Sequence, residues 1–377
     1  MPKKSLFLIL KQCTKSNMKI PSIFVGCGKF GLQRLQILIQ KTNFLPVACV
    51  DKNISQAKKR LNSIKETKEL KLQYRVFPSI KKALEKHKAL ASFIFVAADQ
   101  HSNLVIESLE NNLNTYCVKP IAVNQKELKK ILKTYKRKKN LMLLQGFNNQ
   151  WNDAALKMKD LMNKENGIGK MIGGQCICWG RQNLSQKPPH IEVKKKGMFF
   201  LALACHQLSQ LVTIKGLPDY VTSYVHKRHD SEIGQIGIFG TSGGQCIFEY
   251  PGKIPFSYSG TRAAHGNPYG FASRWSGQWI IHGEKGDIKR EGGRITVFKN
   301  GKIVEDNYLK DLDHDLINDE NRQFDAFHSA LISKKKSKKL YETSIDTWIL
   351  MEACNESARK NIKISVKNFK KKLLKHL

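Results

Sequence analysis

The sequence lacks any long apolar segment. Although 41% of its 377 residues are hydrophobic, no apolar run approaches the roughly 20 residues that a membrane-spanning helix requires. The apolar stretch at residues 5–10 is short and is not followed by a small-residue cleavage site. We therefore expect a cytoplasmic protein with no membrane segment and no secretion signal, in which residues 1–17 form a basic extension. The length predicts two domains.

A paired arrangement of cysteines is also missing. The nine cysteines are an odd number and are scattered mostly through apolar segments, which is typical of buried thiols in a reducing compartment. Cys176 and Cys178 face the same side of an expected strand, but no second pair follows at the spacing of a zinc site. The sequence therefore predicts neither a disulfide framework nor a metal site.

Arginine is scarce for so basic a chain. The formal net charge is +34, yet only 12 of the 65 basic residues are arginine, and the lysines are spread along the chain in short runs. Clustered cations would indicate phosphate contacts with a nucleic acid, whereas dispersed lysines are typical of solvated helix faces. We expect weak adhesion to polyanions at low salt and no specific nucleic-acid partner, and keep nucleic-acid binding as an alternative function.

A glycine turn follows the first strand pattern. Residues 20–25 predict a buried strand, and the apolar spacing from Leu32 predicts a helix. Between them, a G-x-G-x-x-G turn would bend tightly, bring backbone amides to a pyrophosphate and pack the helix on its strand. The motif alone is weak, because purely structural glycine turns are common. The residues expected to contact a dinucleotide here are Gly26, Gly28, Lys29, Phe30 and Gly31.

An acidic residue stands where a ribose-binding carboxylate is expected. Asp51 ends a second strand pattern at residues 44–50 and lies 20 residues beyond Gly31. Its carboxylate would accept hydrogen bonds from the adenosine ribose and repel a 2′-phosphate, so we predict NAD as the cofactor. Because Lys52 follows Asp51, NADP stays an alternative cofactor. The other interpretation is that Asp51 contacts no cofactor and is a solvated aspartate at the start of a loop.

Strand and helix patterns continue to alternate up to residue 147. This alternation predicts an α/β fold with an N-terminal Rossmann domain, a doubly wound parallel sheet, over residues 18–147. An amphipathic helix then leads into strand patterns typical of a second, α+β domain over residues 148–344. These patterns begin at residue 171 and recur at 220–226, 235–239, 244–250, 279–282 and 295–298.

Later motifs resemble the glucose-fructose oxidoreductase and inositol dehydrogenase family, Gfo/Idh/MocA. Ala97-Ala98 followed by His101 stands where that family has Thr-Pro and then His, and Val118-Lys119-Pro120 stands where it has Glu-Lys-Pro. The likeness continues in Gly146-Phe147-Asn148 with Trp151, in Gly167-Ile168-Gly169-Lys170, in the helix with His206 and in a closing helix at residues 345–364.

The resemblance implies a nicotinamide-dependent dehydrogenase or reductase of a secondary alcohol in a sugar, cyclitol or sugar derivative. It implies that Ala97 and His101 line the cofactor site, that Lys119 reaches the nicotinamide and the reacting hydroxyl, and that His206 is the general acid and base. An imidazole titrates near ambient pH and suits removal of the hydroxyl proton, while a lysine stabilises developing negative charge. Without the resemblance, Lys119 reads as a solvated lysine and His206 as a packed core histidine.

The resemblance also implies the architecture around the substrate. The second domain would contain an open, mostly antiparallel sheet that forms a homodimer or homotetramer, and residues 345–377 would add a helix packing back on the first domain and a basic tail. Asn148 and Trp151 would contact the substrate.

A loop-rich segment at residues 257–279 offers further substrate contacts. Trp275 presents an apolar face to a sugar ring and Arg262 a polar group to hydroxyls or an anion, although a plain structural loop explains the pattern equally well. Residues 181–196 read as a mobile lid or as an ordinary surface loop.

Two of the departures from the family pattern replace carboxylates. The motif glutamate is Val118, and the aspartate one helical turn before His206 is Ala202. A carboxylate at position 202 would orient the imidazole, and loss of such a group lowers activity by orders of magnitude. Either another side chain replaces it or the protein is a weakened or inactive NAD-binding sensor or scaffold. The candidate replacements are Asn148, Gln150 and Gln207.

Overall fold

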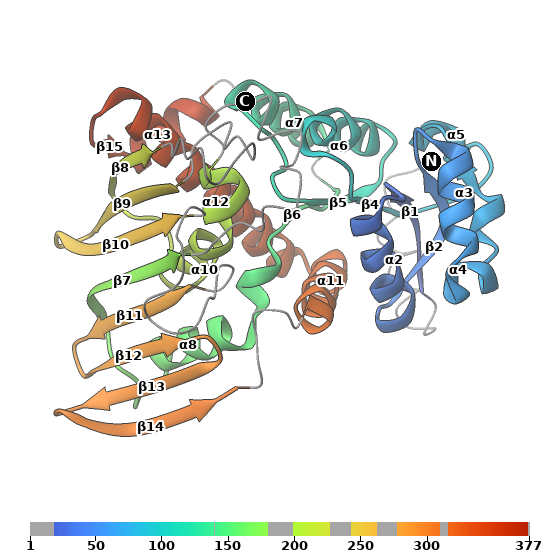
Figure 1. Ribbon diagram of the computed structural model, residues 1–377. Helices are drawn as coiled ribbons and strands as arrows, with labels where there is room; N and C mark the ends of the chain where they lie inside the picture. The colour runs from blue at the N-terminus through green and yellow to red at the C-terminus, as the bar shows by residue number, and fades with distance from the viewer. Residues whose placement is uncertain are drawn as a thin grey trace, which may run out of the picture. The chain divides into compact units, whose positions relative to one another are not determined.

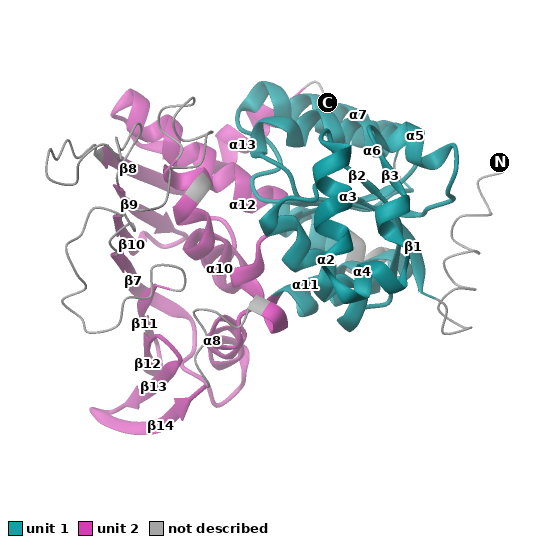
Figure 2. Ribbon diagram, turned by 45° about the vertical axis from the view of Figure 1, so that its right-hand side comes forward, with its two compact units in different colours: residues 1–146, 320–344, 376–377 teal, residues 147–319, 345–375 magenta. Residues whose placement is uncertain are grey.

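The protein forms two compact units, coloured separately in Figure 2. The first comprises Met1–Gly146, Glu320–Ser344 and His376–Leu377, and the second comprises Phe147–Asp319 and Ile345–Lys375. Each unit is therefore assembled from segments far apart in the sequence. The structure, a computed structural model, describes residues 19–138, 140–179, 199–226, 243–261, 277–309 and 316–375.

A six-stranded sheet with the order β3-β2-β1-β4-β5-β6 forms the centre of the first unit (Figure 1). All of its pairings are parallel, which confirms the predicted doubly wound sheet. The strand order reverses between β1 and β4, and folds of this kind bind ligands beyond the carboxyl ends of the strands at that point. The strands are β1 (Ile20–Val25), β2 (Phe44–Val50), β3 (Val76–Phe77), β4 (Ala91–Ile94), β5 (Asn114–Val118) and β6 (Leu143–Gly146).

Amphipathic helices connect these strands. In α7, for example, Asn124 accepts a hydrogen bond from the Glu127 backbone at the helix start, and Leu128, Ile131 and Leu132 are buried on one face. The connecting helices are α2 (Lys29–Lys41), α3 (Ile54–Asn62), α4 (Lys65–Glu69), α5 (Ile80–Leu84), α6 (His101–Glu110) and α7 (Gln125–Arg137), with short turns η1 (Leu72–Tyr74) and η2 (Ala98–Gln100).

An aromatic cluster makes the core of the first unit. Phe44 of β2 and Phe93 of β4 pack with ring centroids 4.8 Å apart, and Phe327 of α11 (Leu316–Ile332) lies 5.8 and 5.7 Å from them. Such pairs each contribute about 0.5–1.5 kcal/mol beyond their buried area. Phe324 of the same helix is also fully buried in this core. The segment from Glu320 onward therefore completes the core that the N-terminal residues begin.

The second unit is built on a nine-stranded sheet with the order β14-β13-β12-β11-β7-β10-β9-β8-β15. Its pairings are antiparallel except for β10 with β7, which confirms the expected mostly antiparallel α+β domain. The strands are β7 (Met171–Trp179), β8 (Tyr220–His226), β9 (Gly243–Tyr250), β10 (Ile254–Thr261), β11 (Gln278–Gly283), β12 (Gly286–Glu291), β13 (Arg294–Lys299), β14 (Lys302–Tyr308) and β15 (Ile364–Ser365).

Helices lie on one face of this sheet, and no described helix covers the other face (Figure 1). The polypeptide enters the unit through the short turn η3 (Asn148–Trp151), and a π-helical turn, η4 (Phe200–Ala204), leads into α10. The helices are α8 (Asp153–Asn163), α10 (Cys205–Lys215), α12 (Lys334–Lys360), of which residues from Ile345 belong here, and α13 (Val366–Leu374).

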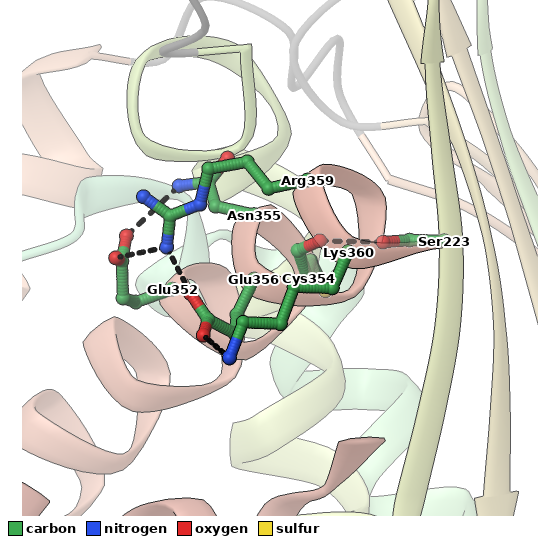
Figure 3. Close-up of polar contacts among 7 residues, drawn as sticks. All are labelled: Ser223, Glu352, Cys354, Asn355, Glu356, Arg359 and Lys360. Atoms are coloured by element: carbon green, nitrogen blue, oxygen red, sulfur yellow. Dashed lines mark hydrogen bonds and ion pairs between the residues drawn. The ribbon is translucent and has the colours of Figure 1, made fainter. Parts of the chain in front are cut away.

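Hydrogen bonds attach α12 to the edge of the sheet. The hydroxyl of Ser223 on β8 donates to the carbonyl of Cys354 at 2.5 Å (Figure 3). Farther along, Arg359 pairs with Glu352 at 3.3 Å and also with Glu356 (Figure 3). This part of the closing helix therefore packs within the second unit.

The segment boundaries differ from the expected ones. Residues 320–344, expected in the second domain, group with the first unit, and residues 345–375, which contain the expected closing helix, group with the second. The reason is that Phe324 and Phe327 are buried in the first core, while β15 pairs with β8 after the closing helix. The assignment of cofactor binding to the first unit and of substrate binding to the second stays a prediction.

Local patterns explain the other differences. Residues 257–261, expected in a loop, belong to β10, in which buried Phe256 and Tyr258 alternate with exposed positions. The sequence analysis also did not predict β12 and β14. The expected N-terminal extension, the lid at residues 181–196 and the strand at 235–239 lie outside the described residues.

Three further observations concern the described part of the chain. Its eight cysteines are buried free thiols. No three His, Cys, Asp or Glu side chains of these residues come together as a group that could hold a metal ion. None of the described helices combines the length and the apolar character needed to cross a membrane.

Candidate functional site

The glycine turn joins β1 to α2 by a close backbone approach. Gly26 has a φ of 101°, which L side chains rarely adopt, and a Cβ there would lie 2.3 Å from the carbonyl oxygen of Phe95. A Cβ on Gly31 would lie 2.1 Å from the carbonyl oxygen of Gly26. Both positions therefore require glycine for the packing of the first unit itself.

Gly28 is different, because a Cβ there would meet no protein atom within 4 Å and its φ of −73° suits any residue. It stands at the N-terminus of α2, where no side chain caps the helix and the first turn contains no acidic residue. Backbone N–H groups and the helix dipole at such an end attract an anion. These features fit the pyrophosphate of a dinucleotide, and a side chain at position 28 would occupy the same space.

Asp51 is fixed beside this turn. Its Oδ2 accepts a hydrogen bond from the backbone N–H of Cys27 at 2.8 Å, and its Oδ1 accepts one from the backbone N–H of Asn53 at 2.8 Å. The guanidinium of Arg60 donates to the carbonyl of Cys27 at 3.3 Å from the neighbouring α3. Each carboxylate oxygen has a second lone pair, so the aspartate is oriented and can still accept hydrogen bonds from ribose hydroxyls.

A buried polar cluster lies behind the first turn of α2. Phe30 is 48% exposed, and the Arg34 guanidinium lies 3.5 Å from the centroid of its ring. Arg34 donates to Glu320 at 3.3 Å, and Gln323 donates both to Glu320 and to the hydroxyl of Tyr116. Burial outweighs the attraction of Arg34 and raises the pKa of Glu320. The sequence analysis missed this cluster, although an arginine on the apolar face of α2 was a visible signal.

Lys119 follows the end of β5, and His101 begins α6 after the neighbouring strand β4. Lys119 directly follows β5 and is half-buried. His101 is buried, with Nδ1 2.7 Å from the carbonyl of Pro120 and Nε2 3.0 Å from the carbonyl of Val96. Burial lowers the pKa of His101, and the two carbonyls act in the opposite direction. The ring therefore braces the backbone next to Lys119, while Ala97 is exposed at the start of η2.

His206 is held through one ring nitrogen in the second unit. It lies on α10, is 9% exposed, and its Nδ1 is 2.7 Å from Oδ1 of Asn149 on η3. The preceding residue of the motif, Asn148, and the following Trp151 are half-buried. The structure thus brings together His206 and an asparagine that the sequence analysis did not name.

A buried arginine fixes the two elements that carry this pair. The guanidinium of Arg290 on β12 donates to Gln210 at 2.7 Å and to Asn152 at 3.0 Å. The Gln210 amide in turn donates to the carbonyl of His206 at 2.8 Å. Because Asn152 directly follows η3, Arg290 connects η3 with α10 independently of the His206 to Asn149 contact.

A π-helical turn precedes α10. This turn, η4, contains position 202, and a π-helix departs from the regular spacing of an α-helix. Of the expected substitutes, Gln150 accepts a hydrogen bond from Thr213 at 3.2 Å and Gln207 accepts one from Tyr258 at 3.2 Å.

Two expected substrate contacts, Arg262 and Trp275, lie outside the described residues.

Family models match both parts of the chain. The Gfo/Idh/MocA model described as an oxidoreductase family with an NAD-binding Rossmann fold matches residues 21–146. The model of the C-terminal alpha/beta domain of the same oxidoreductase family matches residues 191–366. Together the two matches cover most of the chain. Comparison with curated protein sequences found no match.

Solved structures share this fold. An oxidoreductase from Agrobacterium radiobacter in complex with NAD+, L-tartaric acid and magnesium is 15% identical over 93% of this chain and 99% of its own, with a TM-score of 0.74. A myo-inositol 2-dehydrogenase from Lactobacillus plantarum is 17% identical over 92% of this chain and 99% of its own, with a TM-score of 0.70. An oxidoreductase from Thermotoga maritima is 19% identical over 93% and 99%, with a TM-score of 0.74. At these identities the likeness shows the fold alone.

Proposed function

Because this chain belongs to the Gfo/Idh/MocA oxidoreductase family and has its NAD-binding Rossmann fold, we propose that it is a dehydrogenase or reductase of sugars or cyclitols. It would transfer a hydride to or from a secondary alcohol carbon. The observation that carries this proposal is the contact of His206 with Asn149 at 2.7 Å, because a base that is held at one ring nitrogen has a defined direction for proton transfer at the other.

The cofactor contacts in this proposal follow the glycine turn. The open position at Gly28 and the oriented carboxylate of Asp51 support binding of the pyrophosphate and the adenosine ribose. The carboxylate favours NAD because it would repel a 2′-phosphate, although NADP stays an alternative because Lys52 follows Asp51. When bound, the nicotinamide supplies the carbon that accepts or donates the hydride. The proposed contact residues are Gly26, Gly28, Lys29, Phe30, Gly31, Asp51, Ala97, His101 and Lys119, with His101 acting through the backbone it braces.

Two side chains of the protein would handle the proton and the developing charge. As the hydride leaves the carbinol carbon, the hydroxyl proton passes to a ring nitrogen of His206. The ammonium of Lys119 donates a hydrogen bond to the oxygen on which negative charge develops. In the reverse direction His206 returns the proton to that oxygen.

The substrate class is proposed from chemistry and from relatives. One structural neighbour is a myo-inositol 2-dehydrogenase and another was crystallised with L-tartaric acid, and both of these small molecules carry adjacent hydroxyl groups. A site with asparagine, arginine and tryptophan side chains suits such molecules, because it combines hydrogen-bonding groups with an apolar face. The proposed substrate contacts are Asn148, Trp151, Arg262 and Trp275.

The face of the nine-stranded sheet that no described helix covers supports a homodimer or homotetramer. Strand pairing aligns a row of uncharged side chains across five strands, although 65 of the 377 residues are basic. Ile247 in this row is 57% exposed, and depletion of charge with exposed apolar groups is typical of interface centres. Light scattering should show an oligomer that Ile247→Lys dissociates. The row consists of Thr222, Ile247, Ser257, Gln175 and Ile280.

Cofactor titration followed by a substrate screen tests the proposed reaction. NADH fluorescence should show saturable binding, and NAD reduction should be detectable by absorbance on a panel of polyols and sugars. His206→Ala should abolish turnover and leave NADH binding intact. Binding without turnover on the whole panel would favour the sensor or scaffold function. Failure to bind NAD(H) or NADP(H), combined with salt-sensitive binding of nucleic acid that survives Gly28→Ala, would favour the nucleic-acid alternative.

A further inference from the structure

We propose that Asn149 is the positioning residue for His206. Its side-chain oxygen holds the imidazole in the tautomer that carries the proton on Nδ1, which makes Nε2 the nitrogen that exchanges a proton with the substrate. This inference rests on the proposed acid and base role of His206. It also assigns the task of orienting the ring to an uncharged group on η3, because residue 202 is alanine.

The chemistry of the two groups defines the tautomer. Oδ1 of Asn149 is only an acceptor, and it lies 2.7 Å from Nδ1 of His206. A neutral imidazole has one N–H donor and one acceptor nitrogen, so Nδ1 donates and Nε2 keeps the lone pair. Asn149 is 4% exposed, and solvent therefore competes little for this hydrogen bond.

The surrounding contacts keep the pair together. Asn149 is closely followed by two residues that bond other elements, since Gln150 accepts a hydrogen bond from Thr213 on α10 and Asn152 accepts one from Arg290 on β12. On the other side, Gln210 connects Arg290 with the His206 carbonyl. These buried hydrogen bonds hold η3 and the backbone of α10 in place around the pair, and support of this kind is what a positioning residue requires.

An amide partner has a different electrostatic effect from a carboxylate. A carboxylate within about 4–6 Å raises the pKa of a histidine because it stabilises the imidazolium, whereas a neutral amide supplies only its dipole. Among the described residues, Arg290 is linked to the backbone of His206 through Gln210, Tyr258 donates to the neighbouring Gln207, and Cys205 directly precedes His206. Burial raises the pKa of Tyr258, so this group is neutral. Asn149 therefore orients the ring without the stabilisation of the imidazolium that a carboxylate would add.

The test combines nitrogen NMR of the imidazole with kinetics. The full-length protein is labelled with ¹⁵N-histidine, and His206 is assigned by comparison with His206→Ala. Wild type should show Nδ1 protonated and Nε2 unprotonated in the neutral ring. Asn149→Leu, which removes the acceptor at similar size, should give a mixture of tautomers and a kcat about 10- to 100-fold lower, with the affinity for NADH unchanged.

Asn149→Asp supplies the second variant and is nearly isosteric. It should keep the tautomer, raise the pKa of His206 by about 1–3 units and move the acidic limb of the kcat/KM profile for alcohol oxidation to higher pH by the same amount. Asn163→Ala, which removes an exposed asparagine at the end of α8, is the control and should change none of these properties.

Two results would overturn the inference. One is a wild-type ring protonated on Nε2, and the other is a tautomer that stays unchanged in Asn149→Leu while Asn149→Asp fails to move the pKa. The tautomer is measured without substrate, so it is independent of turnover. If His206→Ala kept full activity, the proposed function would fail while the Asn149 contact could still be verified by NMR.

Discussion

Arg34 and Glu320 form an ion pair of 3.3 Å in which the two side chains are 6% and 3% exposed. They lie 286 positions apart in the sequence. Arg34 belongs to the helix that starts at the glycine turn, and Glu320 is the first residue of the C-terminal segment that returns to this unit. The pair therefore joins α2 to the segment that completes the core.

Removal of one side chain of this ion pair should destabilise the first unit. Glu320→Ala leaves the Arg34 guanidinium buried without its carboxylate, and we expect the free energy of unfolding to fall by about 3–5 kcal/mol. Arg34→Met combined with Glu320→Leu removes both charges and should recover most of this loss. Urea unfolding of Arg34→Met, of Glu320→Leu and of the double variant, each compared with wild type, measures the coupling. Additive effects of the single substitutions would contradict a paired role.

The glycine turn permits a comparison of two equivalent substitutions. Gly28→Ala places a methyl group in space that no protein atom occupies within 4 Å, so we expect an unchanged melting temperature and an affinity for NADH at least about tenfold weaker. Gly31→Ala places the same group 2.1 Å from a backbone oxygen and should destabilise the protein by about 1–3 kcal/mol or more. Calorimetry and fluorescence titration distinguish the two effects. Equal losses of stability would contradict this division of roles.

Asp51 should determine the choice of cofactor. Asp51→Ser removes the charge that repels a 2′-phosphate and the acceptor for ribose hydroxyls. We expect the affinity for NADH to fall by about 10- to 100-fold, since hydrogen bonds to charged groups contribute about 1.5–3 kcal/mol, and the affinity for NADPH to rise relative to NADH. Competition titrations with both cofactors measure the ratio. Substitution of the nearby exposed Lys58 by Ala serves as the control, and an unchanged ratio in Asp51→Ser would refute the assignment.

The second unit contains a carboxylate whose contribution to the stability of the fold depends on pH. Hydrogen bonding to Lys157 at 2.7 Å, helped by Asn307, lowers the pKa of Glu305 from 4.5 to about 2. A carboxylate whose pKa is lower in the folded state than in the unfolded state stabilises the fold at pH values above its unfolded-state pKa. This stabilisation is lost as the pH falls through its folded-state pKa. The stability difference between wild type and Glu305→Gln should be constant above about pH 5 and should shrink toward pH 2.

Urea unfolding at a series of pH values follows this difference. Glu69→Gln is a suitable control, because Glu69 is exposed and its contact with Lys65 is 3.9 Å long. Exposed pairs at this helical spacing contribute about 0.3–0.5 kcal/mol, so the control should show little change at any pH. A Glu305 effect that persists undiminished at the lowest pH would argue against ionisation as its source.

The first unit was largely predictable because its signals are local. The predicted strand at residues 44–50 matches β2, and the glycine turn connects a strand to a helix as expected. A buried parallel strand is a continuous apolar run, and the turn requires glycine at fixed positions, so both are visible in the sequence. The contribution of α11 was not predictable in this way, because Phe324 and Phe327 belong to a core formed by residues hundreds of positions earlier.

The site in the second unit was predictable only in part. His206 was found by resemblance, but its partner depends on how η3 approaches α10, and nothing in the spacing of Asn149 indicates this contact. Likewise, the strand β14 escaped prediction because Ile303 and Val304 are both exposed, which breaks the alternation that identifies a half-buried strand. Tertiary contacts, and not local pattern, decide these positions.

The divided first unit has a consequence for synthesis. A ribosome finishes the strands that carry Phe44 and Phe93 early, but it produces Phe324 and Phe327 only after residues 147–319 of the other unit. Until then the first unit lacks the α11 side chains that complete this aromatic core, and exposed apolar surface promotes aggregation during folding. The first unit can therefore finish folding only after nearly the whole of the second has been synthesised.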